Sequence, residues 1–358
     1  MRLGYHTGYW SAGPPPGALD AVLAAERLGF DSVWTAEAYG SDALTPLAWW
    51  GAQTRTIRLG TAIAQLSART PTAAAMAALT LDHLSGGRFT LGLGASGPQV
   101  VEGWYGQPYP KPLARTREYV AIVREVLARE KPVTYDGEFY TLPLRGGTGL
   151  GKSLRSTVHP LRADLPIHLA AEGPKNITMS AEIGDGWLPL FYSPRMDDTY
   201  RQLLADGFAR RGTVAGAREP RPVEEFEVSA TVPVVVHDDV EAAADAVRPF
   251  IALYAGGMGA KGANFHRDVL VRLGYEEACD EIQAHYLAGR RAEATAAVPL
   301  ELVQDIALVG PPAKIRAELA AWERTAVTTI IVQGDVASLA VVADALEVGA
   351  SATESATG

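Results

Sequence analysis

The chain has 358 residues, 47% of them hydrophobic, which is enough to bury the core of one large barrel or of two medium-sized domains. A net charge of −9 argues against nucleic acid or an anionic membrane as the main partner, and the single cysteine, Cys279, excludes an intrachain disulfide. The N-terminus lacks a signal peptide and no stretch reaches the ~20 apolar residues of a membrane span, so we expect a cytoplasmic protein with a small-molecule substrate.

Strand-like and helix-like segments alternate through the first part of the chain. The predicted strands are residues 2–10, 30–39, 57–66 and 88–96, and the predicted helices are 18–29, 41–54, 70–87 and a segment that starts near Pro98. Gly29 ends the first of these helices, as a C-terminal glycine does. Four such units with short connections indicate parallel strands.

The alternation continues to the C-terminal part of the chain. Further strands are predicted at 166–173, 184–193, 225–239 and 328–335, which brings the total to eight. Eight strands that alternate with helices predict one (β/α)8 TIM barrel over residues 1–340, in which the length beyond about 250 residues forms insertions. We expect the insertions at about 132–165 and 255–305, and at 341–358 the end of a C-terminal helix followed by a frayed tail.

Residues 92–97 read GLGASG and match the G-x-G-x-x-G pattern of dinucleotide-binding folds. A Rossmann fingerprint belongs to an early strand–turn–helix unit and needs an acidic residue at the end of the next strand, ~20 residues later. Here the motif lies in the fourth unit and a helix follows at that distance, so the Rossmann interpretation fails. Two interpretations stay open: a turn that binds phosphate through backbone N–H groups, and close packing at the rim of the barrel.

Several segments at predicted strand ends carry a family resemblance. They are DSVWTAEAYGSDALTPLAWW (31–50), RLGTAIAQLSARTPTAAAMAALTLDHLSGGRF (58–89), LGLGASGPQVVEGWYG (91–106), LAAEGPKN (169–176) and GDGWLP (184–189). Together they resemble the bacterial luciferase-like flavin superfamily, and most closely its coenzyme F420-dependent branch. The resemblance covers about residues 1–335.

The resemblance implies a (β/α)8 barrel, usually a homodimer, that binds its cofactor at the carboxyl ends of the strands. It also implies a non-proline cis peptide in the third strand, at Ala62–Ile63, behind the cofactor ring. Gln65 is a candidate for a hydrogen bond to the carbonyl edge of that ring. The phosphate-bearing tail of the cofactor falls beside two loops. Their residues are Gly94, Ser96, Gly97 and Pro98 in one loop, and Ala171, Glu172, Gly173, Pro174, Lys175 and Asn176 in the other. Arg69 is a further candidate for the phosphate.

Glu37 and His6 are the candidates for proton transfer, because each ends a barrel strand. Glu37 stands where the family's sugar-phosphate dehydrogenases carry an aspartate followed by histidine. Ala38 replaces that histidine here, which argues against a sugar-phosphate dehydrogenase. Two alternatives stay open for these residues: Glu37 caps a helix or pairs with an arginine, and His6 is a core residue. Trp104, Trp187 and Tyr192 are predicted either to line a substrate pocket or to pack.

The function that these features favour is F420-dependent hydride transfer between the deazaflavin C5 and a small organic substrate with a C=C, C=N or carbonyl/alcohol group. The first alternative is an FMN-dependent monooxygenase that uses O2 and a partner flavin reductase, and the second is a barrel that binds a flavin without catalysis. No metal is expected, because the seven histidines form no His-x-His pair. A serine hydrolase is not expected either, since the G-x-S-x-G elbow is missing.

Overall fold

Eight parallel strands close into a barrel in the computed structural model, which describes residues 1–213, 218–259 and 264–346. In barrel order the strands are β1 (Arg2–His6), β2 (Ser32–Thr35), β3 (Arg58–Thr61) continued by β4 (Ala64–Gln65), β5 (Phe89–Gly94), β8 (Ile167–Ala170), β9 (Gly186–Leu188), β10 (Glu227–Val236) and β12 (Thr329–Gln333). Each strand pairs in parallel with the next, and β12 pairs with β1 to close the ring. The predicted fold class and all eight predicted strands are therefore confirmed.

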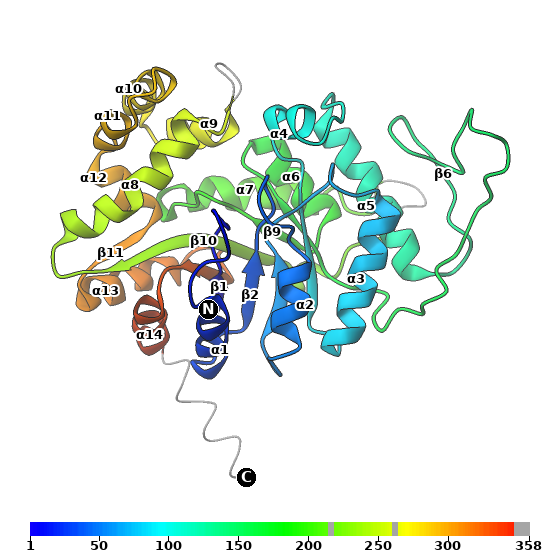
Figure 1. The fold of residues 1–358 in the computed structure, drawn as a ribbon, viewed down its shortest axis with the longest axis horizontal. Coiled ribbons are helices and arrows are strands. Elements are labelled where there is room, and N and C mark those ends of the chain that lie inside the picture. The colour runs from blue at the N-terminus through cyan, green and yellow to red at the C-terminus, as the bar shows by residue number, and fades with distance from the viewer. Residues whose placement is uncertain (214–217, 260–263, 347–358) are drawn as a thin grey trace, which may run out of the picture.

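Helices cover the outside of the barrel (Figure 1). They are α1 (Ala18–Arg27), α2 (Thr45–Gly51), α3 (Pro71–Ser85), α4 (Pro98–Gly103), α5 (Pro112–Ala128), α6 (Pro174–Ile183), α7 (Asp197–Phe208), α8 (Val240–Gly256), α13 (Pro312–Trp322) and α14 (Val336–Ala345). The main hydrophobic core lies between these helices and the outer face of the sheet. In the described part of the chain no helix combines the length and the apolar character of a membrane span. The tail predicted to fray, from residue 347 on, lies outside the described residues.

The two predicted insertions lie toward opposite ends of the long axis of the molecule (Figure 1). The first holds a two-stranded hairpin, β6 (Tyr135–Asp136) and β7 (Thr141–Leu142). The second holds α9 (Phe265–Arg272), α10 (Glu276–Leu287), α11 (Arg291–Ala296) and α12 (Leu300–Ile306), which form a second hydrophobic core with α8. Cys279 is buried in that core, as its helical setting suggested. A short strand that the sequence did not predict, β11 (Leu308–Gly310), pairs in parallel with the last residues of β10.

A tryptophan and a histidine fill the middle of the barrel. Trp34 from β2 stacks on His168 from β8, with ring centroids 5.9 Å apart. Gly60 makes room for the indole, because a Cβ at this position would lie 2.3 Å from a Trp34 ring carbon. The middle of the barrel is thus filled by side chains.

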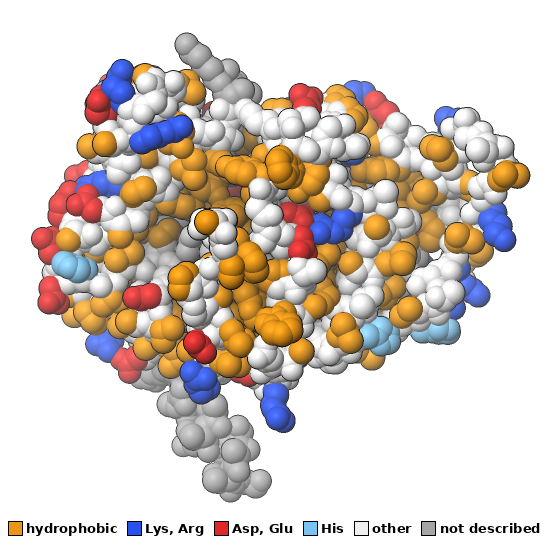
Figure 2. Space-filling model, in the orientation of Figure 1, with side chains coloured by type: hydrophobic (Ala, Val, Ile, Leu, Met, Phe, Trp, Pro, Cys, Tyr) orange, Lys and Arg blue, Asp and Glu red, His pale blue; other side chains and the backbone are white. Residues whose placement is uncertain are grey.

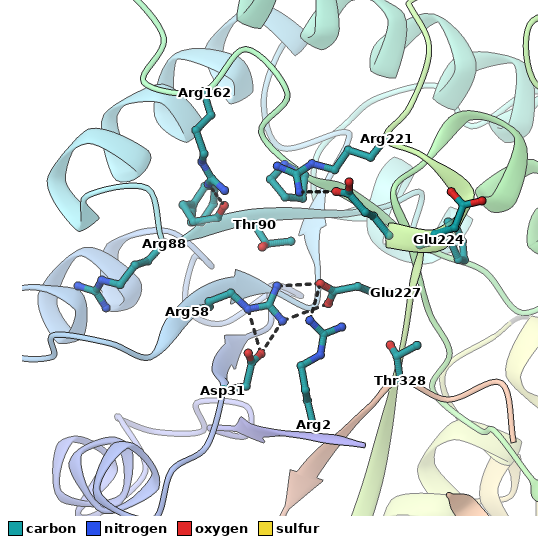
Figure 3. Close-up of a pocket in the computed structure, with 14 residues that line it drawn as sticks. Arg2, Asp31, Arg58, Arg88, Thr90, Arg162, Arg221, Glu224, Glu227 and Thr328 are labelled. Atoms are coloured by element: carbon teal, nitrogen blue, oxygen red, sulfur yellow. Dashed lines mark hydrogen bonds and ion pairs between the residues drawn. The ribbon is translucent and has the colours of Figure 1, made fainter. Parts of the chain in front are cut away.

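An arginine–carboxylate network closes the amino end of the barrel (Figure 3). The residues of this network line a cavity of about 450 Å3. Within it, Arg58 binds Glu227 at 2.9 Å and also binds Asp31. Arg2 binds the same Glu227 carboxylate at 3.1 Å. Burial raises the pKa of Glu227, but protonated His168, Arg58 and Arg2 together lower that pKa to about 2. Because the charges compensate one another, we infer that the amino end stabilises the fold. The active site of a (β/α)8 barrel is expected at the carboxyl end.

Candidate active site

The loops at the carboxyl ends of the strands bring together the candidate residues that lie far apart in the sequence. The third strand is interrupted between β3 and β4, and the peptide bond Ala62–Ile63 in this gap is cis, as predicted. Neighbouring strand ends hold the gap: Ala62 N–H donates to the Thr35 carbonyl at 2.6 Å, and Glu37 N–H donates to the Ile63 carbonyl at 3.0 Å. The backbone here is fixed by strand two.

Gly94 explains part of the GLGASG motif. A Cβ at Gly94 would lie 2.7 Å from the side chain of Ile63, so the glycine lets the cis segment approach β5. In the first half of the motif, the glycine therefore serves close packing, which is one of the two interpretations that the sequence left open. In the second half, Ser96 has a left-handed φ of 57° and Gly97 precedes the six-residue helix α4. That half of the loop, with Pro98, stays a predicted cofactor contact.

Glu37 is buried in an ion pair. Its Oε2 accepts a hydrogen bond from Arg69 Nη1 at 2.8 Å and another from the backbone N–H of Gln65 at 2.9 Å. Arg69 is therefore committed to a carboxylate, which weakens its candidacy for a cofactor phosphate. Of the two interpretations that the sequence left open for Glu37, this arrangement favours the structural pairing with an arginine.

Gln65 has one free polar atom in this buried cluster. Its side-chain Nε2 donates to the carbonyls of Glu37 and Ala38, at 3.1 and 3.3 Å. Its Oε1 is buried and has no hydrogen-bond partner among the described residues. The free group is an acceptor, so Gln65 suits an N–H of a ligand ring better than the ring carbonyl that we expected it to contact.

His6 is buried beneath the same segment and is neutral at pH 7, since burial lowers its pKa to about 4. Its Nδ1 accepts a hydrogen bond from the Gly8 N–H at 3.0 Å, so the single proton of the neutral ring lies on Nε2. The hydrogen bond from Gly8 therefore fixes the ring to the loop that follows β1.

The second predicted loop begins helix α6. Gly173 is the N-cap of this ten-residue helix, Pro174 is its first residue, and Lys175 is exposed beside Asn176. Ala171 is buried, and its carbonyl accepts a hydrogen bond from Trp187 Nε1 at 2.8 Å.

Glu172 lies in the loop just after β8, and the pKa of its carboxyl group is raised. Its Oε1 accepts from the Leu190 N–H at 3.2 Å, and Arg272 Nη2 donates to its backbone carbonyl at 2.6 Å. Burial raises the pKa of the Glu172 carboxyl to about 8, so it keeps a proton at neutral pH.

Two of the three aromatic residues predicted to line a substrate pocket are core residues. Trp187 is 1% exposed and packs against Tyr192 and against Tyr200, which lies in α7. Tyr192 also contacts Trp322. The residues on either side of Trp187, Gly186 and Leu188, face the barrel interior, so Trp187 faces the helices. The prediction for Trp187 and Tyr192 is corrected accordingly. Trp104, at the end of α4, is exposed and stays a candidate.

Tyr9 and Tyr254 form a polar contact at this end of the barrel that the sequence did not indicate. Their hydroxyl oxygens lie 3.0 Å apart, although the residues are separated by 245 positions. The only local signal was the aromatic run around Tyr9 after the first strand, because Tyr254 lies within the apolar pattern of α8.

The sequence and the structure both match known proteins. The sequence profile described as luciferase-like monooxygenase matches residues 3–329. A Mycobacterium tuberculosis protein, whose name proposes a coenzyme F420-dependent oxidoreductase, is 59% identical over 334 residues, which cover 93% of this chain and 94% of that protein.

Two solved structures share the fold. The coenzyme F420-dependent tetrahydromethanopterin reductase of Methanopyrus kandleri superposes with a TM-score of 0.77 at 20% identity and covers 96% of this chain and 97% of its own. An F420-dependent secondary alcohol dehydrogenase, in complex with an F420–acetone adduct, has a TM-score of 0.76 at 16% identity and covers 97% of this chain and 98% of its own. At such identities these two likenesses establish the fold.

Proposed function

This chain belongs to the luciferase-like monooxygenase family, and within that family we propose that it is an oxidoreductase that uses coenzyme F420 to exchange a hydride with a small organic substrate in the cytoplasm. The observation that carries the proposal is the 59% identity, over almost the whole chain, to the relative named for F420. The free acceptor of Gln65 at the carboxyl end supports it.

The residues present fit a deazaflavin. The pyrimidine edge of that ring carries an N–H, and the buried Oε1 of Gln65 offers the acceptor that such a group requires. Ala62 and Ile63 would support the face of the ring, because the backbone of strand two fixes this segment. A bound deazaflavin supplies hydride chemistry at its C5, and the chain supplies orientation and proton transfer.

The cofactor tail would lie along the loop from Gly94 to Pro98 and along the start of α6. Lys175 is an exposed cation in the first turn of that helix, where the helix dipole also favours an anion. Asn176 stands beside it as a neutral donor. This arrangement suits an acidic, flexible tail better than a neutral one.

The alternative cofactor is FMN, with O2 and a partner flavin reductase. FMN has the same pyrimidine edge, so Gln65 alone does not discriminate between the two cofactors. The relative at 59% identity is named for F420 and favours the deazaflavin.

We also propose that two copies of the chain associate through the face that carries α2 and α3. Figure 2 shows hydrophobic side chains gathered over the middle of this face, where Figure 1 places α2. Trp49 of α2 is 68% exposed, and Met76 and Leu84 of α3 are exposed with it. Light scattering of the purified protein tests this: a mass of twice 38.0 kDa supports a dimer, and Trp49→Glu should dissociate it.

The experiment that tests the proposed activity is anaerobic reoxidation of F420H2, followed by absorbance. Reduced coenzyme is mixed with the enzyme and with cyclohexanone, cyclohex-2-enone or 2-methyl-1-pyrroline as probe substrates. Protein-dependent return of the oxidised cofactor spectrum with any probe supports hydride transfer. Failure to bind F420 at all would overturn the proposal.

A further inference from the structure

The hydroxyl groups of Tyr9 and Tyr254 form one hydrogen bond between them. Tyr9 lies in the loop after β1, three residues beyond His6, and Tyr254 lies in α8, after β10. Their oxygens are 3.0 Å apart. The pair therefore connects the first barrel unit to the seventh at the carboxyl end.

One of the two hydroxyl protons of this pair is not used in the hydrogen bond between them. Two hydroxyls carry two protons, the shared bond uses one of them, and neither hydroxyl has another hydrogen bond within the described residues. Tyr254 is 2% exposed, whereas Tyr9 is 45% exposed. The buried hydroxyl is satisfied when Tyr254 donates to Tyr9, and this leaves the Tyr9 O–H free for an acceptor outside the protein.

Tyr9 stands beside the segment that would carry the cofactor ring. Its ring centroid lies 6.3 Å from that of His6. His6 pairs with the end of β2, and the Thr35 carbonyl of β2 accepts the Ala62 N–H. A substrate placed over the ring would therefore lie close to Tyr9.

Both tyrosines remain neutral donors at physiological pH. Burial raises the pKa of Tyr9, and burial together with Tyr9 and Glu172 raises the pKa of Tyr254 well above its usual 10. The bond from Tyr254 polarises the Tyr9 O–H and strengthens it as a donor. The other two candidates are engaged elsewhere, Glu37 with Arg69 and His6, through Nδ1, with Gly8.

We propose that Tyr9 donates the proton to the substrate and that Tyr254 positions the Tyr9 hydroxyl. The substrate is then a carbonyl compound or an imine, whose oxygen or nitrogen accepts the Tyr9 hydrogen bond. The inference rests on the proposed F420-dependent function. The carbon of the C=O or C=N group receives the hydride from the reduced cofactor, which is oxidised by two electrons. As the π bond breaks, the heteroatom takes the Tyr9 proton. The phenolate left on Tyr9 accepts the Tyr254 hydrogen bond and regains a proton from water.

A complex that cannot react isolates the hydrogen bond from turnover. Oxidised F420 and cyclohexanone, or cyclohex-2-enone, are bound to the enzyme together, and the carbonyl stretch of the bound ketone is recorded by infrared difference spectroscopy. The wild type should shift this band to lower frequency. Tyr9→Phe should abolish the shift, and Tyr254→Phe should reduce it. Tyr39→Phe, a change at an exposed tyrosine near the pair, is the matched control and should keep the full shift.

Kinetics provide the second measurement. With F420H2 and the ketone that the wild type reduces fastest, Tyr9→Phe should lower kcat at least a hundredfold and leave the F420 Kd unchanged within twofold. Tyr254→Phe should lower kcat about tenfold. An unshifted carbonyl band in the wild type with both ketones, or equal shifts and rates in the wild type and Tyr9→Phe, would overturn the assignment.

The proposed function can fail separately from this inference. If the wild type does not bind F420, both fail. If it binds F420 and reduces a probe while Tyr9→Phe behaves like the wild type, the function stands and only the role of Tyr9 is overturned. Because Tyr9 is partly exposed, its phenylalanine variant should fold, and the unchanged F420 affinity serves as the check.

Discussion

Arg69 and Glu37 form a salt bridge of 2.8 Å at the carboxyl end of the barrel, and the same carboxylate oxygen fixes the backbone of Gln65. The relationship explains how two adjacent strand ends keep a constant geometry around the cis segment. It also gives a buried carboxylate a role other than proton transfer.

A double-mutant cycle tests this role of Glu37. Glu37→Gln should lower the free energy of unfolding by about 3 kcal/mol, because it leaves a partly buried guanidinium without its partner. Arg69→Met should cost a similar amount, and the two changes together should cost less than their sum. Glu37→Gln should keep turnover within about tenfold of the wild type. A hundredfold loss of kcat at unchanged stability would instead make Glu37 a proton-transfer group.

The closed amino end should affect stability without affecting cofactor binding. Arg58→Met leaves Glu227 and Asp31 without their main cation and should lower the free energy of unfolding by about 3–5 kcal/mol. The F420 Kd of the folded variant should stay within twofold of the wild type. Denaturant unfolding and fluorescence titration measure the two quantities. If Arg58→Met kept native stability but no longer bound F420, the cofactor site would lie at the amino end of the barrel, which would contradict our proposal.

Buried histidines should make the protein sensitive to mild acid. The pKa of His6 and that of His168 are both lowered to about 4 by burial, against about 6.5 in the unfolded chain. The unfolded state therefore binds these protons first as the pH falls below 6.5, and stability decreases by about 1.4 kcal/mol per pH unit for each histidine.

The window for this effect lies between pH 6.5 and about 4.5. Below it, the unfolded carboxylates also take up protons, including Glu227, whose pKa in the folded protein is lowered to about 2. Thermal unfolding from pH 8 to 4.5 is the measurement. Stability independent of pH between 6.5 and 4.5 would contradict the assignment of both rings as neutral.

Lys175 should recognise the acidic tail of the cofactor. Lys175→Ala is expected to weaken the binding of polyglutamylated F420 about two- to fivefold, because an exposed ion pair contributes up to about 1 kcal/mol. The binding of a cofactor truncated before the glutamates should weaken much less. Raised salt should reduce the difference. Lys152→Ala, at an exposed lysine of the first insertion, is the matched control. Equal losses for both cofactor forms would refute the assignment.

The barrel was predictable because its strands are short apolar runs that end in glycine or turn residues, and because helices separate them. The cis bond at Ala62–Ile63 followed from the family resemblance and was confirmed. The short strand β11 and the helices of the second insertion were not predicted in detail, because no barrel periodicity constrains segments outside the repeating unit. The hairpin of β6 and β7 contributes two residues from each strand, too few to produce an alternating pattern.

The side-chain partners were harder to predict than the strands. Trp187 was expected at a pocket, yet a parallel barrel buries both faces of each strand, so the apolar run around it does not reveal which side faces the interior. The pair of Tyr9 and Tyr254 joins residues 245 positions apart, and only the closed barrel brings them together. Glu37 could be named as a strand-end carboxylate, whereas its partner Arg69 followed from the geometry of the neighbouring strand.

The choice of cofactor can be measured by titrating the purified protein with F420 and FMN in parallel and following fluorescence quenching. We expect a micromolar or tighter Kd for F420 and an FMN affinity at least tenfold weaker. Preference for FMN would contradict this expectation, and would move the protein to oxygen-using chemistry in which the proton donation assigned to Tyr9 has no place.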